Sequence, residues 1–162
     1  YNTNAKMNPP LRGEEDRMAV LEGIVDGTID VIASDHAPHD EYTKRCEFVG
    51  ASNGIIGLET ALPLSMALLA GGKVSPARLA DLFSAAPARI LGLKGKGSLR
   101  RGADADVTIV DPDAEWEFRE SDVRSKSRNS PFFGWKMKGR AVAVLCRGRI
   151  THSLLKGVSP DV

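Results

Sequence analysis

The stretch TIDVIASDHAPHD, residues 28–40, constrains the fold of this chain more than any other part of the sequence. Its first six residues, 28–33, are mostly β-branched or apolar and follow a polar turn signal, which predicts a short buried strand. Two carboxylates and two imidazoles come directly after it. Because sites in α/β proteins lie at the carboxyl ends of strands, this order predicts an α/β fold with functional side chains at that edge.

The segments on either side of this strand have the periodicity of helices. Residues 14–25 place apolar side chains at helical spacing after an acidic first turn, and Asp26-Gly27 ends the pattern. LETALPLSMALLAGG predicts a largely buried helix that ends at its two glycines. Ser75 before Pro76 predicts the start of another helix, and APARILGLKGKG a further short one. Residues 40–57, which contain several glycines, predict a long loop.

The pattern changes near residue 96. Val107–Val110 predicts a strand, and the stretch around Arg147-Gly148 predicts a hairpin of two short strands. We therefore expect an α/β part over residues 1–96 and a small β part over residues 97–162.

The charge balance gives no reason to expect a polyanionic partner. Among 162 residues, 22 are Lys or Arg and 21 are Asp or Glu, so the net charge is +1. Neither a nucleic acid nor a membrane partner is expected, since no apolar run approaches a membrane span and no signal-peptide pattern opens the chain. Cys46 and Cys146 match no metal-ligand spacing and are expected to be free thiols in a reducing compartment. We expect a cytoplasmic protein.

Asp35 is the first candidate functional residue, because a carboxylate at a strand end can bind a divalent metal and can also accept a proton. It could equally cap a turn. His36 is next in an extended segment and should point away from Asp35. His39 returns after the Ala37-Pro38 turn.

A second candidate segment is KMNPPLR. Asn8 precedes two prolines that restrict the backbone, so its amide could offer a donor and an acceptor to a small polar ligand. Arg12 could pair with a carboxylate. In the third segment, NGIIGLET, the glycines could let backbone amides reach a ligand or could simply form a turn.

Taken together and in this order, NPPLR, SDHAPH, GLET and GADADVTIVD resemble the C-terminal part of bacterial type I dihydroorotases, of the amidohydrolase superfamily. The resemblance covers nearly the whole chain. It implies a zinc-dependent (β/α)₈ TIM-type barrel with a small β-sandwich domain built from both chain ends. Residues 1–96 would then be the C-terminal portion of the barrel and residues 97–162 that of the β-sandwich. The implied reaction is the reversible cyclisation of N-carbamoyl-L-aspartate to dihydroorotate in pyrimidine biosynthesis.

The resemblance also assigns roles. Asp35 matches the family's catalytic aspartate, which contacts zinc. Asn8 and His39 match substrate-binding residues, and Asn53 and Gly54 fall where a loop backbone meets the substrate ring. His36 matches no ligand.

The family's other metal ligands, including a His-x-His pair, precede the part that this chain resembles. The chain has three histidines, and a barrel of this kind needs roughly 250 residues. We therefore expect a fragment that is inactive alone. Such an enzyme would hold a binuclear zinc centre and could form a homo-oligomer or bind aspartate transcarbamoylase. Two alternatives remain: a hydantoinase or allantoinase, or a non-catalytic dihydroorotase-like scaffold of that transcarbamoylase.

Overall fold

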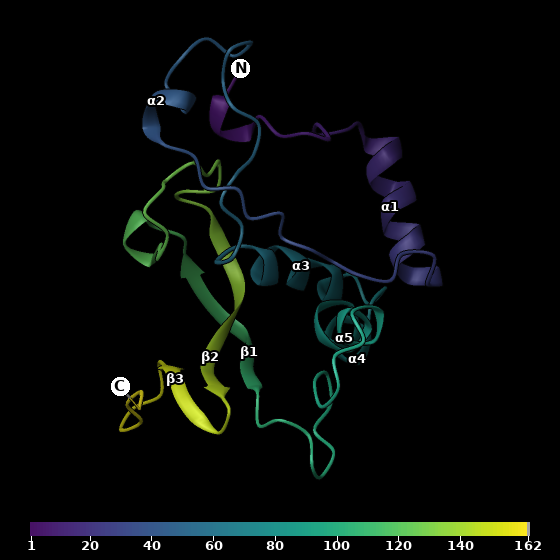
Figure 1. The fold of residues 1–162 in the computed structure, drawn as a ribbon. Helices are drawn as coiled ribbons and strands as arrows, with labels where there is room; N and C mark the ends of the chain where they lie inside the picture. The colour runs from purple at the N-terminus through teal and green to yellow at the C-terminus, as the bar shows by residue number, and fades with distance from the viewer. Residues whose placement is uncertain (162) are drawn as a thin grey trace. The chain divides into compact units, whose positions relative to one another are not determined.

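The computed structural model describes residues 1–161, which divide into two compact units. Unit 1 contains residues 1–29, 33–64 and 116–137, and unit 2 contains residues 30–32, 65–115 and 138–161. The elements follow one another as the colours of Figure 1 show. The expected boundary near residue 96 refers to domains of a larger fold and stays a prediction.

The first helix has the predicted bounds, although Val20 and Val25 of its apolar positions are exposed. Helix α1 (Glu14–Asp26) has three acidic residues in its first turn, where they complement the positive end of the helix dipole. It ends at Gly27, whose φ of 92° is the left-handed conformation that glycine adopts without strain.

The later helices lie within the predicted stretches, although α3 begins three residues after the start of LETALPLSMALLAGG. Helix α3 (Ala61–Ala70) precedes the two glycines. Helix α4 (Pro76–Ala80) is capped by Ser75, whose side chain accepts a hydrogen bond from the Arg78 N–H at 3.1 Å. It runs without a break through the π-helical segment η2 (Asp81–Ala85) into α5 (Ala86–Ile90). Pro87 has no N–H to donate, and the wider π hydrogen bonding occupies the turn before it.

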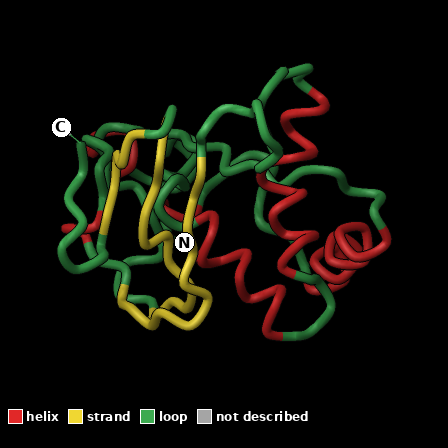
Figure 2. Tube along the Cα trace, turned by 90° about the horizontal axis from the view of Figure 1, so that it is seen from below, coloured by secondary structure: helices red, strands yellow, loops and turns green. Residues whose placement is uncertain are grey.

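Three strands form one sheet in the order β1-β2-β3 (Figure 2). Strand β1 (Val107–Glu117) extends past the predicted end at Val110. The sequence DPD reads as a turn, but β1 lies at an edge of this sheet, where proline is tolerated.

The predicted hairpin is confirmed. Strand β2 (Lys136–Cys146) pairs antiparallel with β3 (Arg149–Ser153). Arg147 and Gly148 both have positive φ, 51° and 78°, as a two-residue type I′ turn requires.

The predicted buried strand over residues 28–33 is wrong. None of these residues is in a strand or fully buried, and the only bridge nearby joins His36 to Ile55 in parallel. A strand needs a neighbouring strand to satisfy its backbone groups, and residues 1–161 supply none beside this segment.

The long loop over residues 40–57 contains one short helix, α2 (Glu41–Lys44), and is otherwise irregular. The Asp40 side chain caps α2 by accepting from the Thr43 N–H at 2.9 Å. The loop ends at Ile56, which is 1% exposed and belongs to the core of unit 1. That core also contains Phe118, stacked on Phe133 with ring centroids 5.0 Å apart.

Two short 3₁₀ turns, η1 (Thr3–Ala5) and η3 (Glu120–Asp122), complete the secondary structure of the described chain. Within residues 1–161, no helix has the length and apolar character needed to cross a membrane.

Candidate functional site

Asp35 has an unusual backbone. Its φ is 43°, a left-handed conformation that a side chain with a Cβ adopts at a cost of about 1–2 kcal/mol. The residue is exposed, and its carboxylate has no hydrogen-bond or ion-pair partner among residues 1–161. Residues with strained backbone conformations cluster at functional sites. Asp35 is therefore free to take an external ligand.

His36 is held in a different way. Its Nδ1 accepts from the backbone N–H of Gly57 at 3.1 Å and lies 3.4 Å from that of Leu58. The ring therefore fixes the start of the GLET segment. The expectation that His36 points away from Asp35 rested on an extended backbone, which Asp35 with its φ of 43° does not have, and it stays a prediction.

His39 and Asn53 are in direct contact. His39 Nε2 lies 2.8 Å from the Asn53 carbonyl oxygen. A carbonyl can only accept, so Nε2 carries a proton and donates it. In the neutral ring, Nδ1 is then left as an acceptor.

Gly54, beside Asn53, is buried and has a φ of 121°. A Cβ at this position would lie 2.6 Å from the Ala37 Cβ and 3.3 Å from His39 Nε2. Only glycine lets the loop approach the DHAPH turn so closely. The Gly54 N–H donates to the Lys6 carbonyl at 2.9 Å. That N–H is therefore already used within the protein, whereas a direct substrate contact would need it free.

Asn8 and Asn53 line one open cavity in unit 1. The cavity has a volume of about 500 Å³ and is formed by the first residues of the chain together with Phe48 and Asn53. Both asparagines are exposed. The cavity thus brings together two residues that are 45 positions apart in the sequence, and His39 touches the second of them. Asp35 is not among the lining residues.

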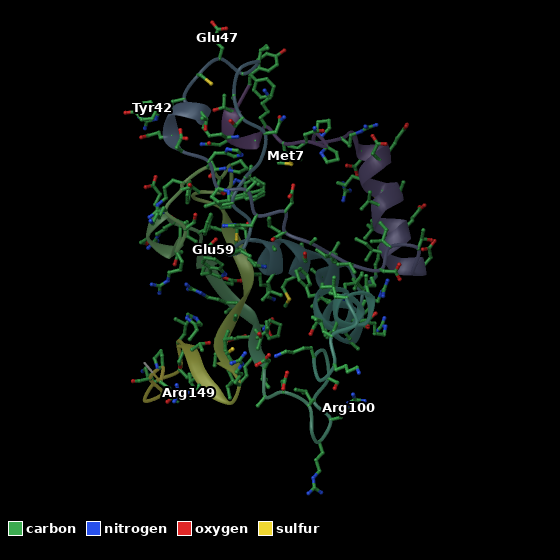
Figure 3. All side chains as sticks on the ribbon, in the orientation of Figure 1. Met7, Tyr42, Glu47, Glu59, Arg100 and Arg149 are labelled. Carbon is green, nitrogen blue, oxygen red and sulfur yellow. The ribbon has the colours of Figure 1, made fainter. Side chains whose placement is uncertain are left out.

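Lys6 joins the KMNPPLR segment to the loop. Its Nζ donates to the carbonyls of Val49 and Ala51 at 2.8 and 2.7 Å, and it lies 5.4 Å from the centre of the Phe48 ring. Tyr42 and Glu47 extend outward from the same loop into solvent (Figure 3). Backbone carbonyls of the loop are therefore bonded to the N-terminal segment through Lys6, whereas the Tyr42 and Glu47 side chains are exposed.

Lys44 is 4% exposed, and its Nζ donates to the carbonyls of Ser52 and Gly54 at 2.8 and 3.0 Å. Burial, followed by the nearby Lys6 ammonium, lowers the pKa of Lys44 below its ordinary value. No pattern in the sequence singles out Lys44. A lysine inside a mixed polar loop gives no sign that its ammonium is buried among carbonyls.

No pattern in the sequence singles out Asn129 either. It is 3% exposed and lies in the irregular segment that follows η3. It reaches both the DHAPH turn and Gly54. Its contacts join residues 75 to 92 positions apart, a separation that no local pattern reveals.

Arg12 pairs with Asp16 at 3.1 Å on the surface. The Arg12 guanidinium is thus already paired with a carboxylate of this chain.

The described side chains do not complete a metal site. No three His, Cys, Asp or Glu side chains of residues 1–161 are grouped so that they could hold a metal ion. A catalytic zinc site takes three protein ligands. Asp35 fits such a site as a single carboxylate ligand, and the others would have to come from outside this sequence.

Unit 2 has an open cavity of its own, of about 540 Å³, beside the glycine-rich stretch at residues 92–97. Its basic lining includes Lys96, which pairs with Asp104 and Asp106, and Arg89, which pairs with Asp81. Because Lys96 and Arg89 already form ion pairs with these aspartates, this cavity is a poor candidate for an anion-binding site.

The sequence profile of the amidohydrolase family matches residues 5–151. The chain belongs to the amidohydrolase family. Members of this family are generally metal-dependent, in keeping with an exposed, unpaired carboxylate at Asp35.

Among curated proteins, this amidohydrolase chain is 53% identical to a dihydroorotase from Geobacter sp. (strain M21) and 52% identical to one from Desulfotalea psychrophila (strain LSv54 / DSM 12343), each over 152 residues. Both matches cover 94% of the chain and 36% of the relative. The chain therefore spans about a third of the length of these relatives.

Among solved structures, the L-hydantoinase (dihydropyrimidinase) from Arthrobacter aurescens superposes with a TM-score of 0.87 at 32% identity, over 96% of this chain and 36% of that one. A D-hydantoinase superposes with a TM-score of 0.85 at 25% identity. The expected fold class, part of an amidohydrolase (β/α)₈ barrel with part of a small β domain, is confirmed.

Proposed function

We propose that the chain is the C-terminal part of a dihydroorotase, which interconverts N-carbamoyl-L-aspartate and dihydroorotate. The observation that carries this proposal is a sequence identity of 52–53% to curated dihydroorotases over 94% of the chain. Identity to the L-hydantoinase is lower, at 32%. The candidate substrate residues Asn8 and Asn53 line one cavity, which supports the same assignment.

In this proposal Asp35 carries the proton. Its unpaired carboxylate can take a proton from the attacking nucleophile and return it to the leaving nitrogen of the opened ring. Asn8 offers an amide donor and acceptor to the substrate, and His39 presents a ring nitrogen beside Asn53.

Asp35 would also contribute one ligand to a binuclear zinc centre, with the remaining ligands supplied by the rest of the enzyme. When bound, zinc supplies Lewis-acid activation of the amide carbonyl and of water. The side chains of this chain then position the substrate and move the proton.

Substrate preference tests the assignment. The complete polypeptide that carries residues 1–162 should be assayed on dihydroorotate, hydantoin and allantoin. We expect dihydroorotate to give the highest kcat/KM. A preference for hydantoin would support the second candidate, which the close superposition on L-hydantoinase favours.

A third outcome is no turnover of any of the three substrates. Together with absence of a His-x-His pair upstream, it would favour a non-catalytic partner of aspartate transcarbamoylase. Co-purification with that enzyme would test this alternative directly.

A further inference from the structure

Asn129 occupies a buried position where three separate contacts meet. Its Oδ1 accepts from the His39 N–H at 3.2 Å, and its Nδ2 donates to the carbonyls of Ala37 and Gly54 at 2.9 and 3.1 Å. Its own backbone carbonyl accepts from the Ile56 N–H at 3.1 Å. One residue therefore joins the DHAPH turn to the loop at residues 54–56.

The chemistry of this position requires a carboxamide. One acceptor faces an N–H and two donors face carbonyls, and a primary amide supplies both kinds of group from one plane. Exchanging the amide oxygen and nitrogen would set donor against donor and acceptor against acceptors, so the contacts fix its orientation. An aspartate would keep the acceptor and lose both donors.

The contacts of Asn129 converge on residues of the candidate substrate face. His39 is held at its backbone by Asn129 and at its ring by the Asn53 carbonyl. The Gly54 carbonyl receives one hydrogen bond from Asn129 and a second, at 3.0 Å, from Lys44 Nζ. The buried Asn129 side chain is bonded both to the His39 backbone and to Gly54, so it fixes the distance between them.

We propose that Asn129 is a positioning residue for substrate binding, acting through His39 and Gly54 without contacting the substrate. The proposal rests on the dihydroorotase assignment. The hydrogen bonds of Asn129 themselves do not depend on that assignment, because they join the same residues whichever cyclic amide is bound. A displacement of about 1 Å at a positioned group can cost on the order of 100-fold in rate or binding.

A double-mutant cycle on the complete enzyme tests the proposal. Asn129→Ala should raise KM for dihydroorotate about 10-fold to 100-fold, with kcat less affected. In the His39→Ala background, the same substitution should raise KM by a several-fold smaller factor, because only the part that acts through Gly54 remains. An equal factor in both backgrounds would overturn the proposal.

The matched control is Ser130→Ala. Ser130 is equally buried at 3% exposure, but its Oγ accepts a hydrogen bond from the Phe132 N–H at 3.3 Å. We expect this variant to keep a wild-type KM and zinc content. A KM in Ser130→Ala raised as far as in Asn129→Ala would mean that any disturbance of this segment has the effect, and would count against Asn129.

Asn129→Ser is a milder second variant, since it keeps a polar group near the same backbone. If both Asn129 variants are insoluble while Ser130→Ala is soluble, Asn129 serves folding and the positioning role is wrong. If the wild type prefers hydantoin, the dihydroorotase assignment fails, and the same cycle measured with hydantoin still decides the role of Asn129.

Discussion

His39 Nε2 lies 2.8 Å from the carbonyl oxygen of Asn53, so an imidazole from the DHAPH turn is oriented by the backbone of a loop 14 residues further on. The contact fixes which ring nitrogen carries the proton, and it leaves Nδ1 as the nitrogen that can meet a ligand. The role of that nitrogen in substrate binding stays a prediction.

The first prediction concerns this histidine. His39→Ala in the complete enzyme should lower kcat/KM for dihydroorotate by about 10-fold or more and leave zinc stoichiometry unchanged. His152→Ala, in strand β3 of unit 2, is the matched control and should have normal kinetics. Loss of zinc from His39→Ala with intact substrate affinity would make His39 a metal ligand.

The second prediction concerns Asp35. Asp35→Asn keeps the size of the side chain and tolerates the left-handed backbone at φ 43°, so it removes the carboxylate alone. We expect kcat to fall by about 10²–10⁴-fold. The control is Asp40→Asn, because asparagine caps a helix as well as aspartate does. Near-normal turnover by zinc-loaded Asp35→Asn would remove Asp35 from proton transfer.

Local sequence signals predicted the parts of the fold that depend on neighbouring residues. Ser75 and Pro76 marked a helix start, and Arg147-Gly148 marked a hairpin, because caps and tight turns are decided within a few positions. Residues 28–33 were predicted wrongly because strand formation depends on a partner strand. β-branched residues indicate a preference for strand conformation, but they do not indicate whether a neighbouring strand is present to pair with.

The residues of the candidate site likewise fall into those that the sequence indicates and those that only the structure reveals. Asp35, Asn8 and His39 were singled out by residue type and resemblance, and their roles stay predictions. Asn129 and Lys44 could not be found from sequence, since each acts through contacts with distant backbone carbonyls. A buried amide or ammonium is recognised only when its partners are in place.

The third prediction tests the close approach at Gly54. Gly54→Ala would set a Cβ 2.6 Å from that of Ala37 and strain a backbone with φ 121°, so it should lower the free energy of unfolding by about 2 kcal/mol or more. Gly50→Ala, where the nearest atom is 3.7 Å away, should have little effect. Chemical denaturation measures both.

The double variant Gly54→Ala with Ala37→Gly sharpens this test. It removes the Ala37 clash and leaves the backbone strain, so stability should return only in part. No recovery at all would show that the close approach to Ala37 is unimportant.

The fourth prediction is a dependence of stability on pH in unit 2. Hydrogen bonding to Arg89 is the main cause that lowers the pKa of Asp81, and Arg78 adds to it. A carboxylate with a lowered folded-state pKa stabilises the fold above its unfolded pKa, and the contribution is lost as pH falls through the folded-state pKa. Asp81→Asn should therefore destabilise the protein near neutral pH, and the penalty should shrink as pH falls below the ordinary aspartate pKa of about 3.9.

Thermal unfolding across this pH range measures the effect. Glu47→Gln is the control, because Glu47 is exposed and makes no ion pair within residues 1–161. Its Tm difference from wild type should be small at every pH. A penalty for Asp81→Asn that is the same at neutral and acidic pH would contradict the role of the ionised carboxylate.

The last prediction concerns the chain by itself. Asp35 is the single metal ligand that we assign, and no three metal-binding side chains of residues 1–161 are grouped as a site. One exposed carboxylate cannot replace a ligand set that gives zinc its affinity. The isolated 162-residue chain should thus hold no stoichiometric zinc after dialysis and should not hydrolyse dihydroorotate. Metal analysis and a dihydroorotate assay test both statements. Two tightly bound zinc ions per chain, or turnover near that of the complete enzyme, would require ligands from within these residues and a rearranged site around Asp35.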